Sequence, residues 1–181
     1  MLETDRLRLR AMRKTDFDSL FALQNDFRVQ PMLTLDHVVP SGPKYEEELM
    51  KMSSELFYAV IEIKKTGEFI GFTILFSFQS KNRDAKLGLA LVPGVWERGY
   101  GTEVVKFMVD YGFRELGLHR VTLNVFGSNT RAIGLYQKIG FVQEGVQRKA
   151  NWIGGKWEDV IWMGILEEDW RASIKETNSG P

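Results

Sequence analysis

A short loop with two glycines is the first feature of the sequence that could do chemistry. The run Arg98-Gly99-Tyr100-Gly101-Thr102 lies between a strand-like segment and a helix-like segment. The first turn of a helix carries unpaired backbone N–H groups and the positive end of the helix dipole, so it binds phosphate readily. Glycine lets the backbone come close to such a ligand. A tight structural turn uses glycine in the same way, so the loop alone leaves both interpretations open.

Two common nucleotide-binding motifs do not fit this loop. The dinucleotide fingerprint needs Gly or Ala at its third glycine position, where this chain has Val104. The nucleoside-triphosphate loop ends in Gly-Lys-Ser/Thr, whereas Gly155-Lys156 is followed here by Trp157. A ligand that carries a pyrophosphate group stays compatible with the loop.

The composition argues against several other kinds of site. The chain of 181 residues has no cysteine, which excludes a disulfide framework, a thiolate nucleophile and a zinc–cysteine cluster. Its two histidines, His37 and His119, lie too far apart for a helical metal motif. The 24 basic residues balance 24 acidic ones, whereas nucleic-acid binding usually needs a basic excess. We therefore expect no metal and no nucleic-acid partner.

The same sequence gives no sign of a membrane protein. No apolar run approaches the ~18 residues that span a bilayer. The N-terminus lacks the basic-then-apolar order of a secretory signal. We expect a cytoplasmic protein without a membrane partner.

Periodic apolar residues predict the elements that must position the loop. Arg6, Arg8 and Arg10 fit the solvated face of the first strand. The polar end of the chain after Trp170 predicts a flexible tail. We expect one mixed α/β domain over residues 1–172 and a tail over 173–181. The expected strands are 7–11, 57–64, 69–79, 86–92, 121–125, 142–150 and 156–166, with helices opening at 15 or 16, over 45–54, from the glycine loop to 116, and from 129 to 139.

Two segments resemble motifs of the GNAT N-acetyltransferase superfamily. Residues 89–103, which end in GYGTE, resemble its coenzyme A motif, and residues 129–141, NTRAIGLYQKIGF, resemble its second motif. The opening ETDRLRLR and the late GKWEDV are similar to one branch, which contains ribosomal-protein-alanine acetyltransferases and, nearby, spermidine acetyltransferases. The resemblance covers about residues 3–170. It implies a strongly curved mixed sheet with helices on both faces, splayed at a coenzyme A cleft.

The resemblance also implies roles for individual residues. The backbone of Leu91 and Val92 would pair with the pantetheine arm of acetyl-CoA. Asn129 would hydrogen-bond the same arm, and Tyr136 would lie beside the thioester sulfur as the catalytic acid. One position departs from the family motif, which usually has Gln or Arg where this chain has Trp96. The amides that would cradle the pyrophosphate belong to Glu97, Arg98, Gly99, Tyr100, Gly101 and Thr102.

Structural interpretations compete with the two catalytic assignments. Tyr136 falls on one apolar helical face with residues 132, 135 and 139, and this pattern by itself favours a core role. Only the surrounding motif favours an acid at this position. Asn129 is also a plausible helix cap, and both of its roles are compatible. Among candidate bases, Asp84 lies just outside the strand before the loop, Glu103 is better explained as a partner of the helix dipole, and Asp159 as a structural hydrogen-bonding group. We therefore assign no general base.

The expected function is direct transfer of an acetyl group from acetyl-CoA to a primary amine. Such a transfer needs a neutral amine, a polarised thioester carbonyl and a proton for the leaving thiolate. A protein N-terminus is the first candidate acceptor, and a polyamine or another small amine is the alternative. A non-catalytic acyl-CoA sensor is a further alternative, although a sensor would not need an acid such as Tyr136. We expect a monomer or a homodimer.

Overall fold

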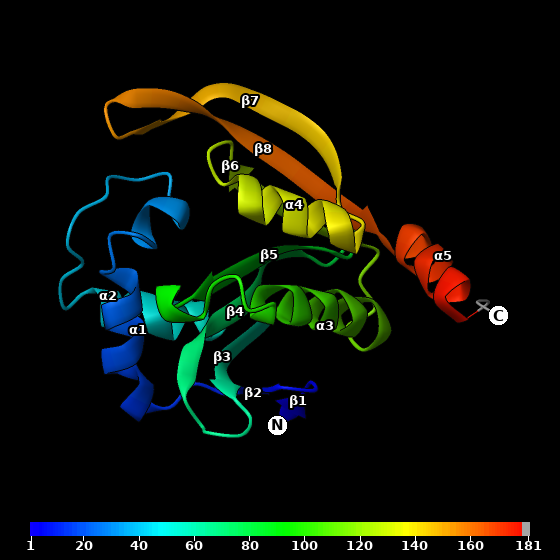
Figure 1. Cartoon of the computed structure of the whole chain (residues 1–181), viewed down its shortest axis with the longest axis horizontal. Coiled ribbons are helices and arrows are strands. Elements are labelled where there is room, and N and C mark those ends of the chain that lie inside the picture. Colours follow the sequence, from blue (N-terminus) through cyan, green and yellow to red (C-terminus); the bar gives the residue numbers. More distant parts are fainter. Residues whose placement is uncertain (179–181) are drawn as a thin grey trace. The chain divides into compact units, whose positions relative to one another are not determined.

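The structure is a computed structural model that describes residues 1–178. Its described part contains eight strands and five α-helices, and the strands form a mixed sheet in the order β1-β2-β3-β4-β5-β6-β8-β7 (Figure 1). The strands are β1 (Leu2–Glu3), β2 (Leu7–Arg10), β3 (Phe57–Ile63), β4 (Phe69–Gln79), β5 (Asp84–Leu91), β6 (Arg120–Phe126), β7 (Val142–Ile153) and β8 (Lys156–Leu166). The helices are α1 (Phe17–Gln24), α2 (Tyr45–Met52), α3 (Tyr100–Arg114), α4 (Thr130–Ile139) and α5 (Glu167–Asn178).

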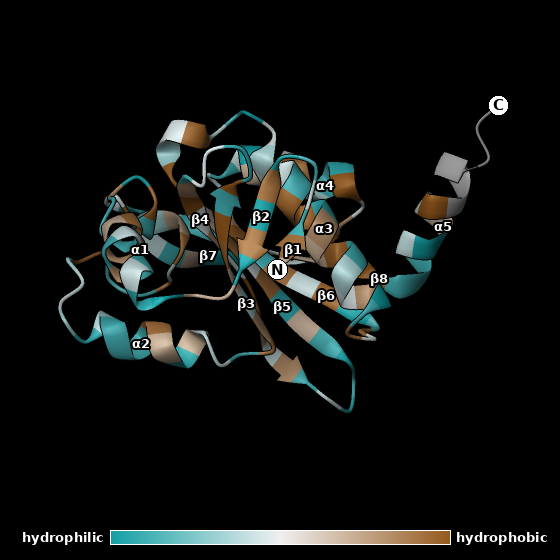
Figure 2. Ribbon diagram, turned by 90° about the horizontal axis from the view of Figure 1, so that it is seen from below, coloured by the Kyte–Doolittle hydropathy of each residue, from teal (hydrophilic) through white to brown (hydrophobic). Residues whose placement is uncertain are grey.

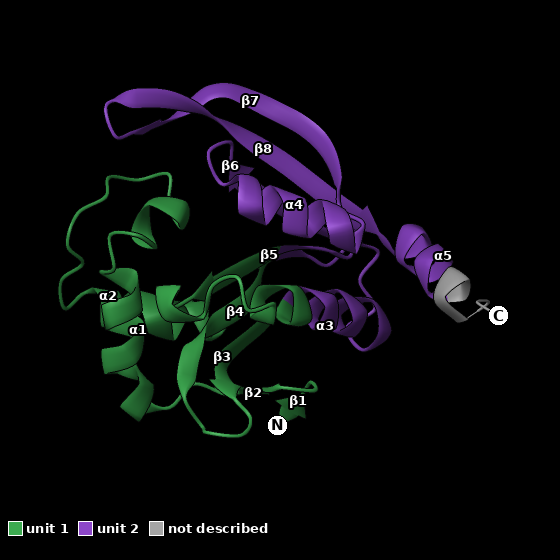
Figure 3. Cartoon of the chain, viewed as in Figure 1, with its two compact units in different colours: residues 1–77, 87–104 green, residues 78–86, 105–181 purple. Residues whose placement is uncertain are grey.

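The chain divides into two compact units, which Figure 3 colours separately. Unit 1 comprises residues 1–77 and 87–104, and unit 2 comprises residues 78–86 and 105–181. Strands β4 and β5 and helix α3 therefore contribute residues to both units. Within residues 1–178, no helix is long and apolar enough to cross a membrane.

In unit 1, helices α1 and α2 cover one face of an antiparallel sheet. Figure 2 shows why, because α2 carries both hydrophilic and hydrophobic residues while strands β3 and β4 have long apolar stretches. Burial of this apolar surface contributes roughly 25 cal/mol per Å² to stability. The buried cluster consists of Leu20, Leu23, Val29, Tyr45, Leu49, Val60, Phe72, Ile74 and Ala90.

Gly71 lets strand β4 approach β5 closely in unit 1. Its φ is +148°, and a Cβ atom there would lie 2.0 Å from the carbonyl oxygen of Ala90. Only glycine fits such a contact, because that separation is far below van der Waals distance. This close approach of the β4 and β5 main chains fixes the position of the end of β5.

A buried charged cluster fixes the turn between β2 and α1. The Arg10 guanidinium donates to both carboxylate oxygens of Asp16, at 2.7 and 2.8 Å, and to Glu62 at 2.7 Å. The hydrogen bonds from Arg10 hold the pKa of Asp16 below its usual range, against the opposing effect of burial. The prediction of a solvated arginine face is therefore wrong for Arg10, which is only 8% exposed. Asp16 lies six residues along the chain and Glu62 lies 52 residues along it, both outside the strand, which is why the strand pattern did not reveal them.

In unit 2, strand β6 is the centre of the sheet. The first residues of β5 pair with it in parallel, Asp84 opposite Arg120 and Lys86 opposite Thr122. On its other side β6 pairs antiparallel with β8, which forms a long hairpin with β7. The part of α3 in this unit buries an apolar stripe made of Val105, Met108, Val109 and Phe113.

The predicted elements agree with the structure except near their ends. Strand β7 continues to Ile153 because residues 151–153 pair with β8 after a shift in register. The two-residue strand β1 was not predicted, since two residues show no period. Residues 167–178 form helix α5, although residues after 170 were expected to fray. Residues 179–181 lie outside the described part, and the domain boundary at 172 stays a prediction.

Candidate functional site

The glycine loop begins where β5 ends in unit 1. After Leu91 the chain makes a 3-10 turn over Pro93–Val95, and α3 opens at Tyr100. The indole Nε1 of Trp96 donates a hydrogen bond to the carbonyl oxygen of Leu91 at 2.8 Å. The aromatic residue that departs from the family motif therefore ties the loop back to the strand end.

Much of the backbone at this strand end already has partners. The amide of Val92 donates to the carbonyl of Ile70 at 2.9 Å, and the Val92 carbonyl accepts from Val95 at 3.1 Å. A carbonyl oxygen has two lone pairs, so the carbonyls of Leu91 and Val92 can each accept a second hydrogen bond. The pairing of these two residues with the pantetheine arm stays a prediction, and it would have to use those lone pairs.

Five consecutive backbone amides, those of residues 98–102, have no partner. In residues 1–178 none of them donates a hydrogen bond, whereas the next amide, of Glu103, donates to Gly99 at 3.1 Å. They open helix α3, where the helix dipole is positive. Residues 97–99 are exposed, so a ligand can reach this end of the loop. The arrangement suits a ligand with several anionic oxygens, such as a pyrophosphate.

The backbone of this loop adopts conformations that favour glycine. Gly99 has φ +81°, and a Cβ atom there would lie 3.3 Å from the guanidinium of Arg6. Glu97 has φ +63° without being glycine, which is uncommon and costs about 1–3 kcal/mol. The loop therefore holds a shape that the surrounding structure must stabilise.

The N-terminal segment supplies that stabilisation. The Arg6 side chain donates to the carbonyl of Arg98 at 2.9 Å and to Glu103 at 2.6 Å, and it lies over the Tyr100 ring at 4.5 Å from its centroid. The Glu103 carboxylate also accepts from the Arg6 amide and from the Thr4 hydroxyl. Burial raises the pKa of Glu103, but the hydrogen bonds from Thr4 and Arg6 outweigh burial and lower it. Glu103 is therefore engaged in holding the loop.

Unit 2 carries the other two predicted site residues, both on or beside helix α4. Asn129 caps the helix, since its side-chain oxygen accepts from the amide of Ala132 at 3.2 Å. Gly140 ends the helix with φ +113° in the left-handed region. Both ends agree with the prediction, and the cap role of Asn129 is confirmed.

Tyr136 is half-buried on α4 rather than part of a closed core. Its ring contacts Phe141 at 5.6 Å between centroids, and no residue of α4 is fully buried. Its hydroxyl makes no hydrogen bond with the described residues. Burial raises the pKa of Tyr136 to about 12, so the hydroxyl keeps its proton at neutral pH.

The other acidic candidates have structural partners. Asp84 lies 3.8 Å from Arg120 and accepts from the Thr122 hydroxyl at 3.4 Å. Asp159 accepts from the amide of Lys149 at 2.8 Å. Neither has the unengaged carboxylate that a general base needs, so none is assigned. Within the described residues, no group of three or more histidine or acidic side chains could hold a metal ion.

Sequence reasoning missed the two residues that brace the loop, Thr4 and Arg6. The segment that contains them gave a strand pattern and a resemblance to one branch of the superfamily, neither of which indicates a contact with the loop, and their partners lie more than 90 positions further on. The structure thus brings together Leu91, Val92 and residues 97–102 in unit 1, and Asn129 and Tyr136 in unit 2.

Known proteins resemble the chain over nearly its full length. An uncharacterized N-acetyltransferase of Bacillus subtilis, YoaA, is 30% identical over 173 residues, which cover 92% of this chain and 97% of that protein. The crystal structure of spermidine N-acetyltransferase from Vibrio cholerae in complex with CoA and spermine superimposes with a TM-score of 0.83. That structure shares 26% identity and covers 93% of this chain and 99% of its own.

Similarity to the ribosomal branch is more distant. A putative ribosomal N-acetyltransferase of Bacillus subtilis, YdaF, is 23% identical over 135 residues, which cover 75% of this chain and 70% of that protein. The expected assignment to that branch is therefore supported only at the level of the superfamily.

The sequence model of the acetyltransferase (GNAT) domain matches residues 6–142, which include the free amides of the loop and the whole of α4. The similar protein of Bacillus subtilis and the similar structure from Vibrio cholerae are both N-acetyltransferases. The chain belongs to the GNAT acetyltransferase family and is an acetyl-CoA-dependent N-acetyltransferase.

Proposed function

We propose that the chain binds the pyrophosphate of acetyl-CoA on the amides of residues 98–102 and acetylates a primary amine directly. The five unpartnered amides at the start of α3 are the observation that carries this proposal. Each charge-assisted hydrogen bond from such an amide is worth about 1.5–3 kcal/mol. Arg6 adds a positive charge beside the loop and holds its shape.

Tyr136 is the proposed acid of the transfer. The amine nitrogen attacks the thioester carbonyl carbon, the carbon–sulfur bond breaks, and the Tyr136 hydroxyl gives its proton to the departing sulfur. The proton lost by the amine passes to water, and the tyrosine recovers its proton from solvent. A pKa of about 12 keeps Tyr136 protonated at neutral pH, so the hydroxyl is in the form that can act as the proton donor. Asn129 is proposed to hydrogen-bond the pantetheine arm through its amide nitrogen, while its oxygen caps α4.

For the acceptor, we propose a polyamine ahead of a protein N-terminus. The likeness to a spermidine N-acetyltransferase over 93% of the chain supports this order. A protein N-terminus is the second candidate, supported by the distant likeness to a putative ribosomal acetyltransferase.

A thiol-release assay tests the activity and the acceptor together. Acetyl-CoA would be incubated with spermidine, with a peptide that has a free N-terminal alanine, or with the same peptide blocked by acetylation. We expect release of CoA with spermidine, less with the free peptide, and none above hydrolysis with the blocked peptide. Greater release with the free peptide would reverse the order of acceptors. Binding of acetyl-CoA without release for any amine would favour the sensor alternative.

A further inference from the structure

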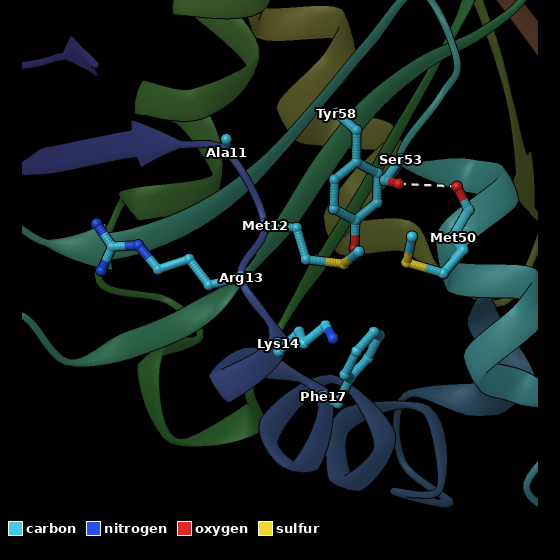
Figure 4. A pocket seen from close by; sticks show the side chains of 8 residues that line it. All are labelled: Ala11, Met12, Arg13, Lys14, Phe17, Met50, Ser53 and Tyr58. Carbon is cyan, nitrogen blue, oxygen red and sulfur yellow. Dashed lines mark hydrogen bonds between the residues drawn. The ribbon is translucent and has the colours of Figure 1, made fainter.

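A pocket in unit 1 lies between the end of β2, the start of α1 and the end of α2. It has a volume of ≈ 280 Å³, and Figure 4 shows its side chains. A cavity of about 150 Å³ holds a benzene molecule, so this pocket has room for a ligand of roughly ten non-hydrogen atoms. Its lining consists of Ala11, Met12, Arg13, Lys14, Phe17, Met50, Ser53 and Tyr58.

The floor of the pocket holds a buried hydroxyl that bonds to nothing. Within the described residues, the Tyr58 oxygen is the one buried side-chain polar atom without a hydrogen-bond partner. Its ring stacks on Phe72 with 5.4 Å between the ring centroids, which fixes the position of the ring. Leaving a buried hydroxyl unsatisfied costs about 1–3 kcal/mol. A bound molecule that hydrogen-bonds Tyr58 would remove this cost.

The side chains around this hydroxyl are mainly apolar and adaptable. Figure 4 shows the thioether groups of Met12 and Met50 on either side of the Tyr58 hydroxyl, with Phe17 further along the wall. Methionine side chains adjust their shape and favour contact with aromatic rings. Ser53 adds no free donor toward a ligand, because its hydroxyl donates to the Met50 carbonyl at 2.8 Å. Because the Tyr58 hydroxyl is buried, a ligand reaches it only when the Met12 or Met50 side chain moves aside. The pocket then offers one polar contact in an apolar setting.

The charges at the rim disfavour a cation. Lys14 lines the pocket and is exposed, and Arg13 lines it as well, although its guanidinium points away from Tyr58. An amine would meet this positive rim, whereas a neutral or anionic oxygen would not be repelled. The Tyr58 hydroxyl can then act as the donor to that oxygen.

This pocket is separate from the glycine loop. Arg6, just before β2, contacts the loop, whereas Ala11, just after β2, lines the pocket. At ~3.4 Å per residue, the five steps from Arg6 to Ala11 hold these two places roughly 17 Å apart. The buried cluster that contains Phe72, Ile74 and Ala90 packs against residues of both places. The lining of the pocket nevertheless shares no residue with the proposed acetyl-CoA contacts.

We propose that this pocket binds a small, mainly apolar molecule whose carbonyl or carboxylate oxygen accepts a hydrogen bond from Tyr58. The proposal goes beyond acetyl transfer and does not depend on the identity of the acceptor amine. The protein would then have a second small-molecule site. This site would prefer a neutral or anionic oxygen to an amine, whereas a polyamine site would prefer a cation.

Methyl NMR on protein labelled at its seven methionines tests the proposal directly. Met12→Leu and Met50→Leu assign the two pocket signals, and buried Met108 and Met163 of unit 2 serve as internal controls. The probes are phenylacetamide, phenylacetate and phenethylamine, which share one ring and differ in their polar group. We expect saturable shifts of Met12 and Met50 with the two carbonyl compounds, and at least tenfold weaker binding of the amine. No shift with either carbonyl compound, or equal binding of phenethylamine, would overturn the proposal.

Tyr58→Phe tests the hydroxyl itself. Loss of one hydrogen bond should weaken both carbonyl probes by about three- to tenfold. The melting temperature should not fall, because the hydroxyl has no partner in the protein. Ser53→Ala is the matched control and should leave probe affinity unchanged. Unchanged affinity in Tyr58→Phe would contradict the proposal, and so would a clear loss of thermal stability, which would indicate a structural partner for the hydroxyl.

Discussion

The glycine loop and helix α4 are stabilised in opposite ways. The loop takes its support from far away in sequence, since Arg6 and Thr4 bind Glu103 and Arg98 across more than 90 positions. Helix α4 is stabilised by residues at its own ends, with Asn129 as the N-terminal cap and Gly140 at the C-terminal end. The loop leaves its backbone amides free, whereas α4 leaves the Tyr136 hydroxyl free.

This difference divides the proposed function between main chain and side chain. A ligand that binds the loop would contact backbone N–H groups, which every residue type except proline supplies. The affinity for that ligand should therefore depend on the shape of the backbone. Proton transfer from α4 would depend on one hydroxyl, so rate depends on one side chain. Substitutions in the loop and in α4 should therefore separate binding from chemistry.

The largest effect should come from Tyr136→Phe, which removes only the hydroxyl. A positioned acid contributes about 100-fold or more, so the single-turnover rate of acetyl transfer should fall by at least that factor. The contact of the ring with Phe141 is kept, so the melting temperature should change little. Single-turnover kinetics avoid masking by slow product release. A near-normal rate, combined with a stability loss of about 1 kcal/mol, would instead mean that the hydroxyl is structural.

Gly101→Val should weaken binding while the chemistry of bound substrate is kept. A branched side chain in the first turn of α3 would hold the pyrophosphate away from the amides, so affinity for acetyl-CoA should fall by roughly ten- to 100-fold. Isothermal titration measures this affinity. Gly94→Val is the matched control, because Gly94 lies just before the loop in open space. Normal affinity in Gly101→Val would show that the phosphate cradle lies elsewhere.

Arg6→Ala should have a smaller effect on the same affinity, because Arg6 supports the loop from outside. Without its bonds to Arg98 and Glu103, the loop should sample other shapes, and acetyl-CoA affinity should fall about three- to tenfold. Arg8→Ala is the control, since Arg8 pairs with Glu3 at 3.3 Å and does not contact the loop. Equal losses in the two variants would mean that only general positive charge matters.

The smallest effect should come from Asn129, where two substitutions separate its two roles. Asn129→Ala removes the cap of α4 and should reduce the free energy of unfolding by about 1 kcal/mol. Asn129→Asp keeps the capping oxygen, so stability should be retained, but it removes the amide donor and should lower acetyl-CoA affinity by a few-fold. Denaturant unfolding and titration measure the two quantities. An aspartate variant with unchanged affinity would leave Asn129 with its cap role alone.

The two regions also differ in how far the sequence could predict them. The start and end of α4 follow from Asn129 and Gly140, because caps act within a few residues. The brace on the loop depends on partners more than 90 residues away, and the burial of Arg10 depends on Asp16 and Glu62 outside its strand, so no periodic pattern contains either. For Tyr136 the apolar pattern and the motif gave competing roles. The structure places its ring against Phe141 and leaves its hydroxyl without a partner, so each role concerns a different part of one side chain.

The central claim, that free amides of the loop hold the pyrophosphate, is tested most directly by amide NMR. Signals of residues 98–102 would be followed during titration with CoA and, separately, with pantetheine, which has no phosphate. We predict large saturable shifts of these five amides with CoA and small ones with pantetheine, while the exposed turn at Gly154 and Gly155 stays unchanged with both. Binding of CoA that leaves the five loop amides unshifted would contradict the account.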